Sequence, residues 1–201
     1  MKTMNVIGAL AMLSLAGAAQ AQIWASAAHN YIQGLQEDGS ALPVERTNTA
    51  NALGVPENDD SFPDTINFVS LGFGGQLTLS FGEQFKDNIY WYETTWNAST
   101  GHFEYADLFV GSGADPLSAT YYLVGNLSNL TEGVPMSLAT VQGNTGIGAW
   151  DYVKFVDTSS FIGLSYADGW DVDGVGADPI PAPGAAALLA VGGLLVTRRR
   201  R

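Results

Sequence analysis

Alternating hydrophobic and polar residues mark a series of short strands along the middle of the chain. In residues 76–81, three apolar side chains fall on one face and three polar side chains on the other, which predicts a half-buried antiparallel strand. Residues 88–95 are aromatic and β-branched on both faces, which predicts a second strand. Further segments with strand composition are residues 66–71, 105–110, 120–124, 137–141, 152–156 and 169–175.

The spacing of these segments predicts an all-β fold. Clusters of Gly, Asn, Asp and Ser separate them, and no helical period is long enough for a βαβ unit. We therefore expect an antiparallel β-sandwich or jelly roll. Residues 26–32 fit either a first edge strand or a single helical turn, and we favour the strand. Repeated glycines in residues 72–75 permit positive φ and close approach of backbones.

The first residues have the pattern of a signal peptide. A basic Lys2 precedes an apolar stretch at residues 6–16, and Ala19 and Ala21 form an Ala-x-Ala cleavage pattern. The apolar stretch is too short for a stable membrane span. We expect residues 1–21 to be removed on export, which leaves residues 22–178 as one ectodomain.

The last residues, 179–201, combine three elements. The first is a proline motif, followed by an apolar run at residues 185–196 that predicts a short helix. The third is a cluster of four arginines, which we expect to hold the C-terminal end of this helix on the cytoplasmic side of a membrane. The alternative is a buried C-terminal helix, but terminal arginines have no use in a core. The motif is Pro181, Ala182 and Pro183, and the cluster is Arg198, Arg199, Arg200 and Arg201.

This layout resembles the PEP-CTERM sorting signal of Gram-negative bacteria, with Pro-Ala-Pro in place of Pro-Glu-Pro. The resemblance implies an exported protein that is held transiently in the inner membrane and then cut by an exosortase-type enzyme. It would finally reside at the cell surface or outside the cell.

Charge narrows the classes of partner. Residues 22–178 contain three basic residues against all twenty acidic ones, a formal charge of −17. Nucleic acid is excluded because phosphate contacts need clustered Lys and Arg, and anionic polysaccharide is disfavoured for the same reason. The chain has no cysteine, which excludes disulfides and thiolate chemistry. The acidity serves solubility or the binding of divalent cations.

An acidic segment near the C-terminus is the candidate metal site. Asp171 and Asp173 are two residues apart, so on a strand they share a face, and Asp168 lies close by. These carboxylates repel one another unless a cation, hydrogen-bond donors or water compensates. One interpretation is a structural Ca²⁺ site that Asp59 or Asp60 completes. The other is that these are ordinary acidic residues at strand ends and turns. The spacing does not fit an EF-hand.

Aromatic side chains are the candidate ligand-binding residues. Tyr90, Tyr92 and Trp96 could stack on sugar faces if they are exposed, whereas aromatic residues in strands also fill cores or form cross-strand pairs. Glu93 and Glu104 lie on neighbouring predicted strands and could form a glycosidase pair about 5–9 Å apart. Twenty acids offer such pairs by chance.

Three segments of the ectodomain resemble a recurring bacterial surface domain that often precedes a PEP-CTERM tail. They are Asn51-Ala52-Leu53-Gly54, residues 68–79 with Val69-Ser70-Leu71-Gly72-Phe73-Gly74-Gly75, and Asp168-Gly169-Trp170-Asp171-Val172-Asp173. The resemblance covers residues 26–177 and implies a jelly-roll-like module of the cell envelope or extracellular matrix without an assigned activity.

Together these features lead to two alternatives. The first is a non-enzymatic matrix or adhesion-type protein that binds carbohydrate and is stabilised by Ca²⁺. The second is a secreted polysaccharide-acting glycoside hydrolase or lyase. A deep acidic cleft containing Glu93 and Glu104 with raised pKa values would favour the enzyme, and a flat aromatic platform would favour the binding module.

Overall fold

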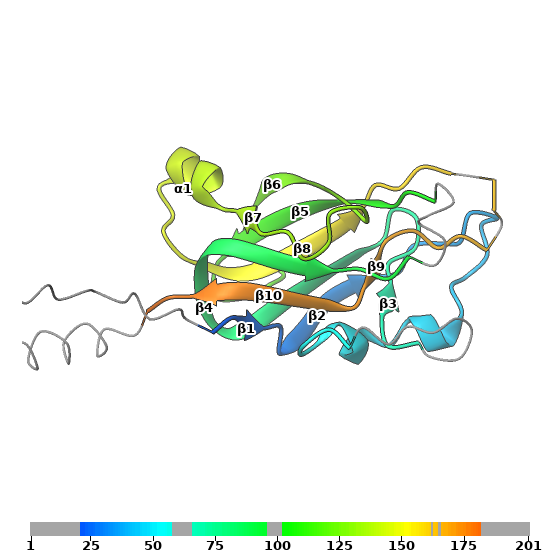
Figure 1. The fold of residues 1–201 in the computed structure, drawn as a ribbon, viewed down its shortest axis with the longest axis horizontal. Coiled ribbons are helices and arrows are strands. Elements are labelled where there is room, and N and C mark those ends of the chain that lie inside the picture. Colours follow the sequence, from blue (N-terminus) through cyan, green and yellow to red (C-terminus); the bar gives the residue numbers. More distant parts are fainter. Residues whose placement is uncertain (1–20, 58–65, 96–101, 162, 165, 182–201) are drawn as a thin grey trace, which may run out of the picture.

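The strands form an elongated antiparallel assembly in the computed structural model (Figure 1), which describes residues 21–57, 66–95, 102–161, 163–164 and 166–181. The strands are β1 (Ile23–Trp24), β2 (Ala27–Ile32), β3 (Val69–Ser70), β4 (Gln76–Tyr92), β5 (Tyr105–Ser112), β6 (Thr120–Ser128), β7 (Met136–Ser137), β8 (Trp150–Asp157), β9 (Asp171–Val172) and β10 (Gly174–Pro179). Two 3₁₀ turns, η1 (Val44–Arg46) and η2 (Thr49–Ala52), and one helix, α1 (Ala139–Thr145), complete the described elements. The expectation of a mostly β, antiparallel fold is confirmed.

The long strand β4 connects the parts of the main sheet. Its first half pairs with β2 and β8, and its second half pairs with β10 and β7. The pairing with β8 shifts register between Ser80 and Phe85, and Gly82 between them has a φ of 77°. Such a bulge bends a strand and increases its twist, so one strand serves both halves of a sandwich. The sheet order is β1-β10-β4-β8-β5-β6, and β3 pairs with β9 in a small second sheet.

The core follows the alternation along β4. Leu77, Leu79 and Phe81 are buried, as predicted, and Ile89 and Trp91 are buried on the later half. The predicted strands at residues 76–81 and 88–95 are therefore one continuous strand up to Tyr92. The other large side chains that are fully buried include Trp150, Trp170, Phe68, Phe85, Phe155, Leu71, Leu108, Leu127 and Leu138.

One predicted strand is wrong. Residues 137–141 leave β7 after Ser137 and enter α1. The reason is that Leu138 and Val141 are the buried side chains here, and their separation of three residues is helical rather than extended. Gly146, with a φ of 74°, ends the helix in the left-handed conformation.

Backbone contact fixes the glycine-rich turn at residues 72–75. A Cβ on Gly72 would lie 2.6 Å from the carbonyl carbon of Gly34, and Gly34 donates its N–H to Leu71 O at 2.8 Å. The buried Asp157 carboxylate accepts the N–H groups of Gly74 and Trp170, both at 2.9 Å. This carboxylate thereby fastens the turn to the segment that carries Asp168 and Asp171.

The two targeting signals fall mostly beyond these ranges. Residues 1–20 and 182–201 lie outside the described residues, so the signal peptide and the sorting signal stay predictions. Within the described ranges, no helix has the length and hydrophobicity that a membrane span requires.

A glycine pair tests the backbone contact. We expect Gly34→Ala to lower the free energy of unfolding by about 2 kcal/mol or more, because the new methyl group meets backbone atoms of residues 72 and 73 that cannot rotate away. Gly143→Ala is the control: it lies inside α1 with open space around it, so it should be neutral or stabilise by about 0.5–1 kcal/mol. Urea midpoints measure both, and equal midpoints would contradict the role of the contact.

Candidate functional site

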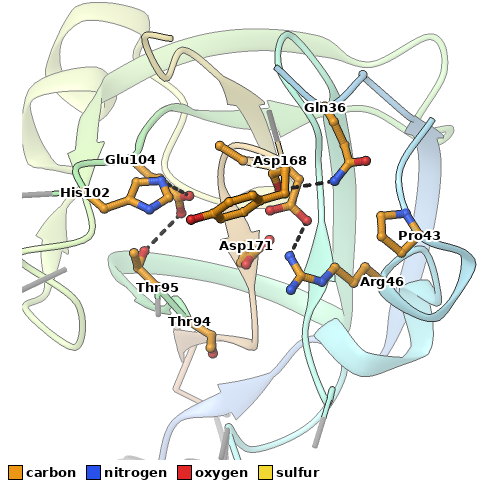
Figure 2. Close-up of a pocket in the computed structure, with 11 residues that line it drawn as sticks. Gln36, Pro43, Arg46, Thr94, Thr95, His102, Glu104, Asp168 and Asp171 are labelled. Atoms are coloured by element: carbon orange, nitrogen blue, oxygen red, sulfur yellow. Dashed lines mark hydrogen bonds and ion pairs between the residues drawn. The ribbon is translucent and has the colours of Figure 1, made fainter. Parts of the chain in front are cut away.

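A cavity of about 400 Å³ is the candidate site, and Figure 2 shows the side chains around it. They come from segments far apart in the sequence, which the strand pairing brings together. The lining residues are Gln36, Pro43, Arg46, Thr94, Thr95, His102, Glu104, Tyr166, Ala167, Asp168 and Asp171.

Three buried carboxyl groups meet at one side of this cavity. Glu93, Glu104 and Asp171, which we call the acidic triad, each place an oxygen within 4.8 Å of the others. Their residues are only 7%, 3% and 5% exposed, respectively. Glu93 directly follows the end of β4, Glu104 directly precedes β5, and Asp171 begins β9. The triad is therefore assembled from strand ends.

The hydrogen bonds of the triad leave its charge poorly compensated. The Thr95 hydroxyl lies 2.6 and 2.7 Å from the two Glu93 oxygens and 3.0 Å from Glu104 Oε2. One hydroxyl has one proton to donate, so it satisfies only one of these oxygens. His102 Nε2 lies 3.0 Å from Glu104 Oε1. One Asp171 oxygen has no hydrogen-bond partner among the described residues.

Burial raises the pKa values of all three acids. The pKa of Glu93 is raised well above its usual value by burial first and by the charge of Glu104 second. Burial raises the pKa of Glu104 to about 7. The pKa of Asp171 is also raised well above its usual range, by burial and then by the charges of Asp168 and Glu104. Without a cation, the triad therefore holds protons near neutral pH.

His102 is a neutral donor in this arrangement. Burial lowers its pKa, so the ring is uncharged at neutral pH and donates its Nε2 proton to Glu104. The Asn129 side chain donates to Thr95 Oγ1 at 2.9 Å and to His102 O at 3.0 Å, which holds both residues against Glu104. These contacts orient the Glu104 carboxyl without neutralising the triad.

Asp168, by contrast, has a counter-charge. Its Oδ2 accepts from Arg46 Nη1 at 2.6 Å and from Ser70 Oγ at 2.9 Å. Arg46 also lies over the Phe68 ring, 5.5 Å from its centroid. Tyr31 donates its hydroxyl to Ser70 O at 2.7 Å, and burial followed by the charges of Asp171 and Asp168 raises its pKa to about 12. The cavity therefore has an ion pair on one side and the acidic triad on another.

The structure separates the predicted metal ligands. Asp171 belongs to the triad, Asp168 is paired with Arg46, and Asp173 accepts the Glu57 N–H at 3.4 Å. Asp59 and Asp60 lie outside the described residues. Sequence reasoning did not consider Glu93 and Glu104 as metal ligands. The sequence did contain a sign that Glu93 is buried, because it follows the apolar Ile89 and Trp91 on the same face of the strand.

Two of the predicted aromatic residues, Tyr90 and Tyr92, do not line the cavity. Tyr90 donates to Asp178 at 3.2 Å, and Tyr92 packs against Trp24 with ring centroids 5.9 Å apart. Trp96 lies outside the described residues. The aromatic residue that lines the cavity is Tyr166, which is 63% exposed. It stands alone in a loop, without a periodic pattern that would have predicted its role.

The geometry of Glu93 and Glu104 differs from that of a glycosidase pair. Such enzymes hold two carboxyl groups on opposite sides of a sugar bond, about 5–9 Å apart. Here the two groups share the Thr95 hydroxyl, and each has an oxygen within 4.8 Å of the other. Glu104 lines the cavity, whereas Glu93 is not among its lining residues. The acidic cleft and the raised pKa values are present, but the carboxyl groups do not flank a space for substrate.

Comparisons with known proteins add only distant likenesses. No protein-family model matches the chain, and no curated protein matches it. Among solved structures it is similar to a GH31 CBM32-2 bound to GalNAc, with a TM-score of 0.38, 10% identity, and coverage of 80% of this chain and 100% of the other. It is also similar to truncated AlyQ with CBM32 and alginate lyase domains, with a TM-score of 0.37, 14% identity, and coverage of 81% and 34%. Likenesses this distant assign neither a family nor a ligand.

The raised pKa of Glu104 predicts a pH dependence of stability in the presence of a chelator. A carboxyl whose pKa is raised on folding stabilises the protein below its unfolded value of 4.5, and this stabilisation is lost as pH rises through about 7. We expect the free energy of unfolding to fall over this window by on the order of 3 kcal/mol more than in Glu104→Gln.

Urea unfolding at several pH values in EDTA measures this difference. The control is Glu83→Gln, because Glu83 is exposed and should follow the wild-type curve. A Glu104→Gln curve parallel to that of the wild type would contradict the prediction.

Proposed function

We propose that this chain is an exported, non-enzymatic cell-envelope or matrix protein that binds carbohydrate in the cavity around Arg46 and Tyr166. The observation that carries the proposal is the combination of an exposed aromatic ring with fixed polar groups in one concave site. Gln36, Arg46 and Asp168 line the same cavity as Tyr166. Sugars present apolar C–H faces and polar hydroxyl edges, which such a combination matches.

The polar groups are held before a ligand arrives. Arg46 and Asp168 fix one another through their 2.6 Å ion pair, and Gln36 Nε2 donates to Tyr166 O at 3.1 Å. Preorganised groups lose less conformational entropy on binding. The acidity of the site and the formal charge of −17 over residues 22–178 favour a neutral sugar over an anionic one.

One observation favours the rival hydrolase or lyase. Glu104 lines the cavity with a pKa of about 7, which suits a general acid. A hydrolase needs a second carboxylate across the sugar bond, and Glu93 lies beside Glu104 rather than opposite it. We therefore propose binding rather than cleavage.

We also propose that the ectodomain binds Ca²⁺, which stabilises its fold. The buried acidic triad supports this proposal because its residues could hold a metal ion. On the sequence evidence, we propose that the signal peptide is cleaved after Ala21 during export, and that an exosortase-type enzyme then acts at Pro181-Ala182-Pro183 during a transient stay in the inner membrane. The partner outside the cell would be an extracellular polysaccharide.

A glycan-array and bulk-polysaccharide screen tests the carbohydrate proposal. We expect saturable binding that Tyr166→Ala weakens at least tenfold, because the variant removes an exposed ring from the cavity while leaving the core intact. Leu117→Ala, at an exposed position of a distant turn, is the control. If Tyr92→Ala abolished binding and Tyr166→Ala did not, the ligand would bind at Tyr92 rather than in the cavity, which would contradict the proposed site.

The same preparations answer the enzymatic alternative. Release of reducing ends or of unsaturated products from any bound polysaccharide would contradict the non-enzymatic proposal. Absence of binding to every glycan, with a folded protein, would contradict the carbohydrate proposal itself.

Thermal unfolding tests the Ca²⁺ proposal. We expect EDTA to lower Tm by several degrees in the wild type, because a bound ion stabilises the folded state in proportion to its occupancy. Asp171→Asn should remove this sensitivity, since it removes one carboxylate of the triad. If the Tm values of wild type and variant do not respond to EDTA, the protein does not use a structural ion.

A further inference from the structure

We infer that the acidic triad is a site for a hard divalent cation whose coordination sphere is open toward the cavity. The ion would form part of the cavity wall that a ligand meets. This inference extends the proposed function. It relies on that function only for the identity of the ligand, a carbohydrate. The argument has three steps: the donor set, an unpartnered buried oxygen, and the open side.

The donor set is composed of oxygens. Glu93, Glu104 and Asp171 each place one oxygen within 4.8 Å of the others, and the Thr95 hydroxyl lies 2.6–3.0 Å from oxygens of Glu93 and Glu104. The nearby imidazole of His102 has its Nε2 atom 3.0 Å from Glu104 Oε1. Carboxylate and hydroxyl oxygens are the ligands of Ca²⁺, Mg²⁺ and Mn²⁺, so this set selects hard ions and excludes soft ones.

An independent observation points to a missing positive partner. Asp171 is 5% exposed, and one of its carboxylate oxygens has no hydrogen-bond partner among the described residues. Asp171 also lines the cavity (Figure 2). An unpaired buried carboxylate is costly, and the Arg46 guanidinium, which lines the same cavity, is engaged by Asp168 at 2.6 Å. A bound cation would satisfy the Asp171 oxygen.

The side on which the coordination sphere is open is given by the donors that line the cavity. Glu104, Asp171 and Thr95 line it, whereas Glu93 is not among the lining residues. A Ca²⁺ ion takes six to eight oxygen ligands, and three carboxylates supply about three to six. The remaining positions face the cavity and are left to water or to a ligand. Three carboxylates and a divalent ion sum to one negative charge, so the remaining positions suit uncharged oxygen ligands such as two adjacent hydroxyls of a neutral sugar.

Terbium luminescence on the full-length chain tests the site with the metal alone. Tb³⁺ substitutes for Ca²⁺, and Trp170 beside Asp171 and Trp91 near Glu93 would sensitise its emission. We expect saturable emission that Ca²⁺ displaces. Glu104→Gln and Asp171→Asn should each weaken the affinity at least tenfold, whereas the exposed Glu83→Gln should leave it unchanged. Both triad variants mimic protonated acids, so they should fold.

Emission lifetimes in H₂O and D₂O then count the waters on the ion. Two or more waters would support the open coordination sphere. No water would identify an enclosed structural ion and overturn the inference, as would emission that survives both triad variants. Because this readout uses no sugar, an open ion site combined with a negative glycan screen would count against the proposed function alone. Sugar binding that is indifferent to Ca²⁺ and to Glu104→Gln would overturn the inference alone.

Discussion

The structure depends on the hydrogen bonding of one strand. β4 pairs with β10, β2, β7 and β8, and a register shift near Gly82 redirects it from one half of the sandwich to the other. The elements that carry the acidic triad are positioned relative to this strand. Glu93 follows its last residue, β9 leads into β10 beside it, and the β5–β8 pairing brings Glu104 close. The site is therefore a product of strand termini, where polar side chains are held by rigid backbone without interrupting the core.

Charge is distributed unequally around the cavity. Asp168 has a guanidinium partner, while the three acids of the triad have one another, a threonine hydroxyl and a neutral histidine. A low-dielectric interior does not tolerate three uncompensated negative charges, so protons or a cation must accompany the fold. The same environment that raises the pKa values of these acids would strengthen their attraction for an ion. The candidate site is thus defined as much by charge balance as by shape.

Local pattern predicted the strands well and the site only in part. Alternation located the first half of β4, where one face is buried, and strand composition located β5, β6 and β8. The prediction was wrong at α1, where residues 137–141, with the apolar Leu138 and Val141 three residues apart, had been predicted to form a strand. Asp171 was predicted as a metal ligand, but its partners Glu93 and Glu104 come from other strands, and that proximity depends on sheet register rather than on spacing. The inward position of Glu93, after Ile89 and Trp91, was the one local sign of a buried carboxylate. Tyr166 had none.

The crossing of Gly34 and Gly72 bears on how related sequences should be read. Where two backbones leave no room for a methyl group, glycine is retained for steric reasons alone. Glycines at positions 34, 72 and 75 would therefore recur in any protein that shares this crossing, whatever that protein binds. Invariance of these glycines would report the shared backbone crossing rather than a shared ligand. Divergence of function would instead be recorded at positions 36, 46 and 166, where side chains face the cavity and the backbone imposes no such restriction.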